Sequence, residues 1–179
     1  MIPLHRNGDW RNILEQPFMI RAAVREDISR IAEILVFGKR VAYRSYFEDD
    51  IGSFCDLQVS YIIEEYRENP GRLKEVVVYD DGIVKGMMRR KSLAEESDSL
   101  ELCELYVEPF FQGEGIGQKL ITFLIKEGEA SHQKDIFLWV IEDNLPARRF
   151  YEKNGFIPDG IKRSVEGTKV TELRYRRSR

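Results

Sequence analysis

Glycines occupy alternate positions in the segment QGEGIG, which runs from Gln112 to Gly117. Small residues let successive backbone N–H groups point into one hollow, and the positive end of a helix beginning near Gly117 would add to its attraction for anions. A pyrophosphate would fit such a hollow. An ordinary glycine-rich turn from a strand into a helix explains a lone cluster equally well, so the flanking sequence has to decide between the two interpretations.

Two well-known phosphate loops fit this segment poorly. A Walker A loop continues with Gly-Lys and then Ser or Thr, whereas Gly117 is followed by Gln118 and Lys119. A dinucleotide fingerprint would carry its third glycine where Gln118 stands, and it would follow the first strand of its fold. Both interpretations are therefore weak.

Other groups with catalytic or metal-binding chemistry are sparse. The two cysteines, Cys55 and Cys103, lack the spacing of metal ligands, and the two histidines, His5 and His132, lie far apart in the sequence. We expect no disulfide framework and no metal site. No histidine near Cys103 in the sequence would activate its thiol as a nucleophile, so we expect a small core residue there.

The length and charge of the chain bound the kind of protein that carries the loop. Its 179 residues fit a single domain, 1–179, in which residues 1–17 form an arm. The net charge of -3, mixed in sign along the chain, gives no general attraction to nucleic acid or anionic lipid. No apolar run approaches the length of a membrane span. We expect a cytoplasmic protein without nucleic-acid or membrane partners.

The elements before the loop follow from hydrophobic periodicity. We predict a strand over 18–24 and a helix over 25–36, after which residues 43–54 break the helical period. A second helix follows over 57–71. Two strands over 75–91 turn around an Asp-Gly pair, which supplies the positive φ angles of a tight hairpin, so these strands should be antiparallel.

The elements around and after the loop alternate in type. A strand over 100–107, a helix over 116–130 and an apolar strand over 136–141 predict a right-handed parallel crossover, whose strands are buried on both faces. A helix over 145–156 and a hairpin over 164–175 follow. We find no internal repeat and no boundary of a second domain.

Two segments, LYVEPFFQGEGIGQKL and IEDNLPARRFYEKNGF, together resemble the GNAT family of acetyl-CoA-dependent N-acetyltransferases. Gln112, Gly115 and Gly117 meet the family's loop pattern, and Gly113 is a further match. The second family motif is met at Asn144, Ala147, Phe150, Tyr151, Asn154, Gly155 and Phe156. The resemblance implies an α/β fold of α+β-like character: a mixed, mostly antiparallel sheet with a central splayed pair of parallel strands, flanked by helices.

The resemblance also implies acetyl-CoA as a co-substrate, without a metal. Its pyrophosphate would bind backbone N–H groups from Gln112 to Gly117, and its pantetheine arm would lie between the strands over 100–107 and 136–141. The backbone of Leu105 and Val107 would hold the acetyl end, with the Val107 N–H polarising the thioester carbonyl. The cofactor residues implied in this way are Leu105, Tyr106, Val107, Gln112, Gly113, Glu114, Gly115, Ile116, Gly117, Asn144, Ala147 and Tyr151.

Acetyl transfer to a primary amine, by direct attack in a ternary complex, is the activity that the resemblance implies. The amine has to lose a proton, and Glu101 and Glu104 are the candidate bases. Glu101 stands six positions before Val107, where many family members carry a base, whereas Glu104 is out of phase with it unless a strand bulge re-aims it. Tyr151 matches the family tyrosine that protonates the departing thiolate.

Two other functions stay open at this point: a noncatalytic module that binds acyl-CoA and reports on it to a partner, and a transferase that uses a longer acyl-CoA. The acceptor, a small-molecule or peptide amine, is not specified by the sequence. Aromatic and acidic residues between 43 and 50 favour a cationic amine beside this segment. The arm over 1–17 is open to three roles, which are covering the acceptor site, joining a homodimer and packing on its own domain.

Overall fold

The computed structural model describes residues 19–48, 50, 52–93 and 98–178, so the predicted arm over 1–17 lies outside it. The strands are β1 (Met19–Ala22), β2 (Val76–Asp80), β3 (Val84–Ser92), β4 (Ser99–Val107), β5 (Asp135–Ile141), β6 (Ile157–Ser164) and β7 (Thr171–Ser178). The helices are α1 (Ile28–Phe47), α2 (Val59–Glu68), α3 (Pro70–Lys74), α4 (Ile116–Ala130) and α5 (Leu145–Lys153), with shorter turns η1 (Arg25–Asp27), η2 (Gly52–Asp56) and η3 (Pro109–Phe111).

The described strands form one seven-stranded sheet in the order β1-β2-β3-β4-β5-β7-β6. Every neighbouring pair is antiparallel except β4 and β5, which are parallel. The α4 helix lies between these two strands in the sequence, because a parallel pair needs a crossover connection. The expected fold class is therefore confirmed: a mixed, mostly antiparallel sheet with a central parallel pair.

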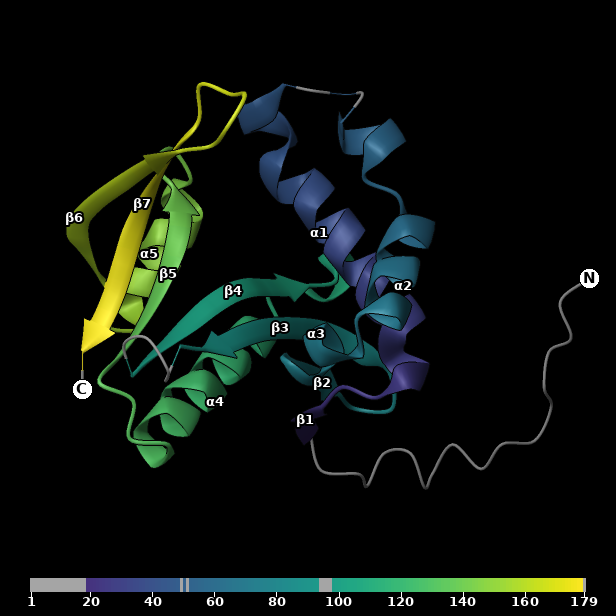
Figure 1. Cartoon of the computed structure of the whole chain (residues 1–179), viewed down its shortest axis with the longest axis horizontal. Coiled ribbons are helices and arrows are strands. Elements are labelled where there is room, and N and C mark those ends of the chain that lie inside the picture. The colour runs from purple at the N-terminus through teal and green to yellow at the C-terminus, as the bar shows by residue number, and fades with distance from the viewer. Residues whose placement is uncertain (1–18, 49, 51, 94–97, 179) are drawn as a thin grey trace, which may run out of the picture.

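The two parallel strands separate part-way along their length. Pairing between them ends at Leu102 on β4 and Leu138 on β5. Beyond that point β4 stays paired with β3 as far as Val107, and β5 stays paired with β7 as far as Ile141. Each strand therefore follows its own half of the sheet, and Figure 1 shows the V-shaped opening between them.

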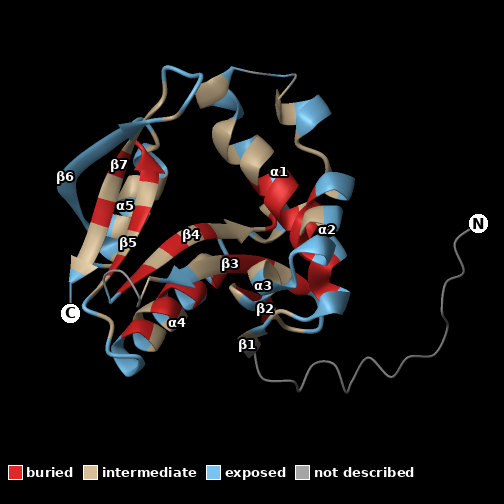
Figure 2. Cartoon of the chain, viewed as in Figure 1, coloured by how far each residue is buried: buried red, intermediate tan, exposed pale blue. Residues whose placement is uncertain are grey.

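Helices cover both faces of the sheet and bury two apolar clusters. The first cluster, with Leu120, Leu138 and Phe156, is packed under α4 and α5. The second, with Ile31 and Val78, is packed under α1 and α2. Figure 2 shows these buried inner faces in red, whereas β6 at the edge of the sheet is exposed along its whole length.

The structure differs from the sequence expectation in several elements, among them α3, which begins at Pro70 where the second predicted helix was expected to end. Helix α1 continues to Phe47, because Tyr43, Tyr46 and Phe47 keep the i, i+3, i+4 spacing of a helix face through the stretch predicted to break it. The π-helical turn η2 was not predicted. Strand β6 begins at Ile157, directly after the cap of α5, whereas the hairpin was expected from residue 164.

Candidate active site

A cleft of about 890 Å³ lies where β4 and β5 separate, and we call it the splay cleft. Its lining comes from α1, β4, the loop before α4, the first turn of α4, β5 and α5. All the predicted cofactor residues line it except Glu114, which is exposed on the loop. Neither candidate base, Glu101 or Glu104, is among the lining residues.

The glycine loop has the backbone shape that an anion site needs. Gly113 and Gly115 have φ angles of 86° and 77°, in the left-handed region that other residues adopt only with strain. Helix α4 starts directly after Gly115, whose carbonyl accepts the N–H of Lys119 at 3.1 Å. The earlier N–H groups of the first turn have no partner within the helix, so they are available to an anion in the splay cleft.

The second sequence motif forms another wall of the splay cleft. Helix α5 begins after Asn144, whose Oδ1 accepts a hydrogen bond from the N–H of Ala147 at 3.1 Å. Asn144 therefore caps its helix in addition to lining the cleft. The side chain of Gln118 donates to Oδ1 of Asn154 at 2.6 Å, which ties the start of α4 to the end of α5.

Trp139 also lines the splay cleft, and the sequence motifs did not single it out. It follows Leu138, the last residue of β5 that pairs with β4. The signal that would have found it is the point of separation of the two strands, which the apolar sequence of β5 does not reveal.

A bulge on β4 determines where both candidate bases point. The register between β3 and β4 passes from Leu102 to Glu104 and skips Cys103. Because Leu102 packs in the cluster under α4, Glu101 points to the opposite face of the sheet. Because of the extra residue, each side chain after the bulge points to the face opposite to the one that strict alternation would give it. Glu104 therefore also points to the face that α1 covers.

Glu104 is buried and held by two cations. Its carboxylate lies 3.3 Å from Lys39 Nζ and accepts a hydrogen bond from Arg89 Nε at 3.0 Å, while Arg89 also donates to Glu75 at 2.9 Å. Burial raises the pKa of Glu104, but Lys39 and Arg89 outweigh it and leave that pKa below its ordinary value. Such a carboxylate is a weak base. Burial raises the pKa of the nearby Cys103 to about 11, which disfavours a thiolate nucleophile.

Three tyrosines from three different elements line the splay cleft. They are Tyr43 of α1, Tyr106 of β4 and Tyr151 of α5, and the Tyr106 hydroxyl donates to the Tyr43 hydroxyl at 3.0 Å. Burial raises the pKa of Tyr151, and the neighbouring Tyr43 adds to that rise. Burial raises the pKa of Tyr43 and of Tyr106 as well. All three phenols therefore keep their protons at neutral pH.

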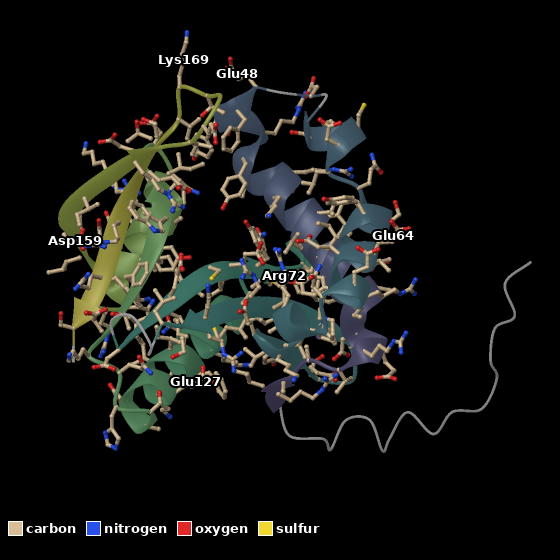
Figure 3. The ribbon with its side chains drawn as sticks, viewed as in Figure 1. Glu48, Glu64, Arg72, Glu127, Asp159 and Lys169 are labelled. Carbon is tan, nitrogen blue, oxygen red and sulfur yellow. The ribbon has the colours of Figure 1, made fainter. Side chains whose placement is uncertain are left out.

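A second cavity of about 710 Å³ adjoins the splay cleft, and we call it the hairpin cavity. It lies between the second half of α1, η2 and the tip of the β6–β7 hairpin. Tyr43 and Tyr46 line both cavities and so form their common wall. Glu48 at the end of α1 and Lys169 on the hairpin tip, both labelled in Figure 3, line the hairpin cavity.

The acidic residues that favoured a cationic acceptor differ in whether they line the hairpin cavity. Glu48 lines the hairpin cavity, whereas Asp50 pairs with Arg44 at 2.8 Å on the surface. Asp49 lies outside the described residues. Of this segment, Glu48 is the described acid with access to the hairpin cavity.

The described part of the chain shows two further absences. It contains no group of three or more His, Cys, Asp and Glu side chains arranged to hold a metal ion. Within the same residues, no helix combines the length and the apolar character that crossing a membrane requires.

The sequence profile of the acetyltransferase (GNAT) family matches residues 39–156. The chain belongs to this family. The match runs from the middle of α1 to the cap of α5, so it includes both motifs that carried the resemblance. An uncharacterized N-acetyltransferase of Archaeoglobus fulgidus is 42% identical over 60 residues, which are 34% of this chain and 41% of that protein. The chain spans less than half the length of the curated relatives that it matches.

Solved structures share the GNAT fold at low sequence identity. The paiA N-acetyltransferase of Thermoplasma acidophilum, in complex with coenzyme A, is similar with a TM-score of 0.68 and 18% identity, over 92% of this chain and 100% of that chain. A putative acetyltransferase of Salmonella typhimurium with its cofactor acetyl-CoA has a TM-score of 0.66 and 19% identity, over 91% of this chain and 94% of that chain. At these identities the likeness shows the fold alone.

Proposed function

We propose that this GNAT protein transfers the acetyl group of acetyl-CoA to a primary amine, directly and in a ternary complex. The observation that carries the proposal is the splay cleft, where a glycine loop at a helix N-terminus and the Tyr151 phenol line one space. The coenzyme A and acetyl-CoA bound by the two structural neighbours support the choice of co-substrate.

The residues of the splay cleft fit coenzyme A chemically. The N–H groups that follow Gly115 suit a pyrophosphate, and none of the described lining residues is an acid that would repel it. Beyond Leu102, none of the described strands pairs with β4 on its β5 side, so backbone groups between Leu102 and Val107 can meet the amides of a pantetheine arm. Leu105, Tyr106 and Val107 all line this stretch.

Acetyl-CoA supplies an acyl thioester, and the residues of the chain have to bind it, orient it and move protons. Tyr151 fits the role of proton donor, because its raised pKa keeps the phenol protonated at neutral pH. Glu104 does not fit the role of base, since Lys39 and Arg89 hold its carboxylate. Glu101 lies outside the cleft lining, so it would act only through an ordered water.

The hairpin cavity is the place that we assign to the acceptor amine. It meets the splay cleft at Tyr43 and Tyr46, so an amine held there faces the acetyl end of a bound co-substrate. Both a small-molecule amine and a peptide N-terminus remain acceptors of the proposed class.

Thiol release from acetyl-CoA tests this function. Free amines, polyamines, aminoglycosides and peptides are supplied in turn, and we expect amine-dependent thiol release together with an acetylated product by mass spectrometry. Propionyl-CoA and succinyl-CoA in parallel test whether a longer acyl group is preferred. Tight binding of acetyl-CoA without amine-dependent release would contradict the proposal and favour a noncatalytic acyl-CoA module.

A further inference from the structure

One arginine joins two walls of the hairpin cavity. Arg40 lies half-buried in the middle of α1 and lines this cavity. Its Nε donates to the carbonyl of Ser53 at 2.8 Å, and its Nη2 donates to the carbonyl of Leu57 at 2.9 Å. Ser53 and Leu57 line the same cavity from the η2 side. The Arg40 side chain therefore ties the η2 wall to the α1 wall.

Aromatic packing restricts the orientation of this guanidinium. Its Cζ lies 5.1 Å from the ring centroid of Phe54, which belongs to η2, and 5.8 Å from that of Phe37 on α1. A guanidinium is attracted to the faces of aromatic rings, and its weak hydration makes such stacking inexpensive. Stacking and hydrogen bonding thus attach the same turn, η2, to the same side chain.

The η2 turn itself has little hydrophobic packing to hold it. None of its five residues is buried. A backbone hydrogen bond from the N–H of Leu57 to the carbonyl of Gly52, at 3.0 Å, closes the turn. Leu57, directly after the turn, packs against the second apolar cluster. The turn is therefore anchored by packing at its end, whereas Arg40 holds it along its length.

The two carbonyls that Arg40 holds require an arginine. They belong to residues four positions apart, and two different nitrogens of one planar group reach them. Arginine presents its donors in a rigid fork, whereas lysine carries a single ammonium on a flexible stem. Arg40→Lys would therefore keep the positive charge of this wall and lose the two-point attachment of η2.

We propose that Arg40 is a positioning residue for the acceptor amine, acting through the η2 wall of the hairpin cavity, a proposal that rests on the proposed function. This cavity meets the splay cleft at Tyr43 and Tyr46, so a fixed η2 wall keeps a bound amine against that junction. Reaction between two bound groups depends on such placement. Arg40 is not among the residues that line the splay cleft, so the co-substrate should not depend on it.

Steady-state kinetics of Arg40→Lys test the proposal, with the amine of the thiol-release panel that the wild type acetylates fastest. The KM for that amine should rise about tenfold, the size of one lost hydrogen bond. The kcat at saturating amine and the KM for acetyl-CoA should stay within about twofold of the wild type. If Arg40 only supplied charge to the cavity, Arg40→Lys would keep the wild-type KM for the amine.

Arg44→Lys is the matched control. Arg44 lies one turn further along α1 and also stacks on Phe54, with its Cζ 5.8 Å from the ring centroid. Its guanidinium pairs with Asp50 on the surface, and it lines neither the hairpin cavity nor the splay cleft. Arg44→Lys should therefore keep all three kinetic constants of the wild type.

Hydrogen exchange of the ligand-free protein, followed by mass spectrometry, tests the attachment of η2 without turnover. Peptides that cover residues 52–58 include the N–H of Leu57, whose hydrogen bond closes the turn. They should exchange about tenfold faster in Arg40→Lys, because the turn opens more often once the two-point attachment is lost. Peptides from α4 should exchange at the wild-type rate, and Arg44→Lys should leave both sets unchanged.

Three results would overturn the proposal. They are a wild-type KM for the amine in Arg40→Lys, an equal rise in the KM values for the amine and acetyl-CoA, and unchanged exchange of residues 52–58. If the wild type acetylates the amine and Arg40→Lys matches it, the positioning role alone is wrong. If coenzyme A binds and the wild type acetylates no amine, the proposed function fails, and the positioning role fails with it whatever the exchange shows.

Discussion

Single side chains decide the chemistry of the splay cleft, and Tyr151 is the one whose role can be isolated most cleanly. Its pKa is raised by burial and by Tyr43, so the phenol keeps its proton at neutral pH and fits the proposed role of proton donor. We expect Tyr151→Phe to keep the affinity for coenzyme A and to lower turnover by about 100-fold, because only the donated proton is lost. Calorimetry and single-turnover kinetics measure the two effects. Equal rates under conditions where chemistry is limiting would remove Tyr151 from the mechanism.

We expect Glu104 to contribute to stability rather than to proton transfer, because its carboxylate is held by Lys39 and Arg89. Its buried carboxylate compensates Lys39 and Arg89, whose side chains are 29% and 18% exposed. We expect Glu104→Gln to lower the free energy of unfolding by about 3 kcal/mol at neutral pH, the lower end for breaking a buried pair. Glu129→Gln, which loses only an exposed contact with Arg177, is the control and should change that free energy by less than about 0.5 kcal/mol.

The contribution of Glu104 also has a defined pH dependence. Its pKa in the folded protein lies below the unfolded value of 4.5, so the stabilisation is fully present above 4.5. It is lost as the pH falls through the folded pKa. In urea unfolding, the difference in the free energy of unfolding between the wild type and Glu104→Gln should therefore narrow as the pH falls below 4.5. A difference that stays constant, or widens in acid, would contradict the assignment.

Sequence patterns predicted the site residues unevenly, for a physical reason. The glycines of the loop and Tyr151 belong to local motifs, so residue types and spacing alone predicted that they belong to one site. The bulge at Cys103 is the reason that Glu101 and Glu104 point to the same face of the sheet. The sequence of β4 alone does not show where its pairing with β3 skips a residue. The pairing of Tyr43 with Tyr106 joins positions 63 residues apart, which no spacing rule connects.

At the scale of elements, the proposed function assigns the pyrophosphate of coenzyme A to the start of α4. The Cβ of a residue at Gly117 would lie 3.8 Å from Leu105, Phe150 and Val107, so a longer side chain there enters the splay cleft. We expect Gly117→Glu to weaken coenzyme A binding by about 100-fold or more, because it places a negative charge beside the pyrophosphate position. Calorimetry with coenzyme A measures the effect.

A matched control separates charge in the cleft from a general effect of the substitution. Gly71 lies in α3, and a Cβ there meets nothing within 4 Å. Gly71→Glu should therefore leave coenzyme A affinity unchanged. If Gly117→Glu is folded, as its circular dichroism would show, and still binds coenzyme A like the wild type, the loop is not the pyrophosphate site.

Most elements could be predicted from hydrophobic period and turn residues, and the exceptions have local causes. The strands and helix of the parallel crossover were expected within a few residues of their observed bounds. The end of α1 was misplaced because its last turns carry aromatic residues that line cavities instead of a continuous core. The early start of β6 was missed because this edge strand buries none of its residues, so it has no hydrophobic alternation to detect.

The whole molecule places two cavities on either side of Tyr43, using segments that are far apart in the sequence. The splay cleft exists because β4 and β5 follow different halves of the sheet after Leu102 and Leu138. The hairpin cavity exists because the tip of the β6–β7 hairpin comes to the end of α1. Neither arrangement is encoded locally, and therefore the sequence motifs predicted the residues of the splay cleft better than those of the hairpin cavity.

Charge at the rim of the hairpin cavity supplies the last prediction, which rests on the proposed binding of a cationic amine there. Glu48 and Lys169 line the cavity from its two sides. Glu48→Gln should raise the KM for the amine by about fivefold, the size of one solvent-exposed charge interaction, and Lys169→Ala should lower it by a similar factor. The KM for acetyl-CoA should stay the same in both variants. Asp50→Asn is the control with no expected effect on either constant, because Asp50 lies on the surface beside Arg44. If Glu48→Gln and Lys169→Ala shift the KM for the amine in the same direction, the hairpin cavity does not select the acceptor by its charge.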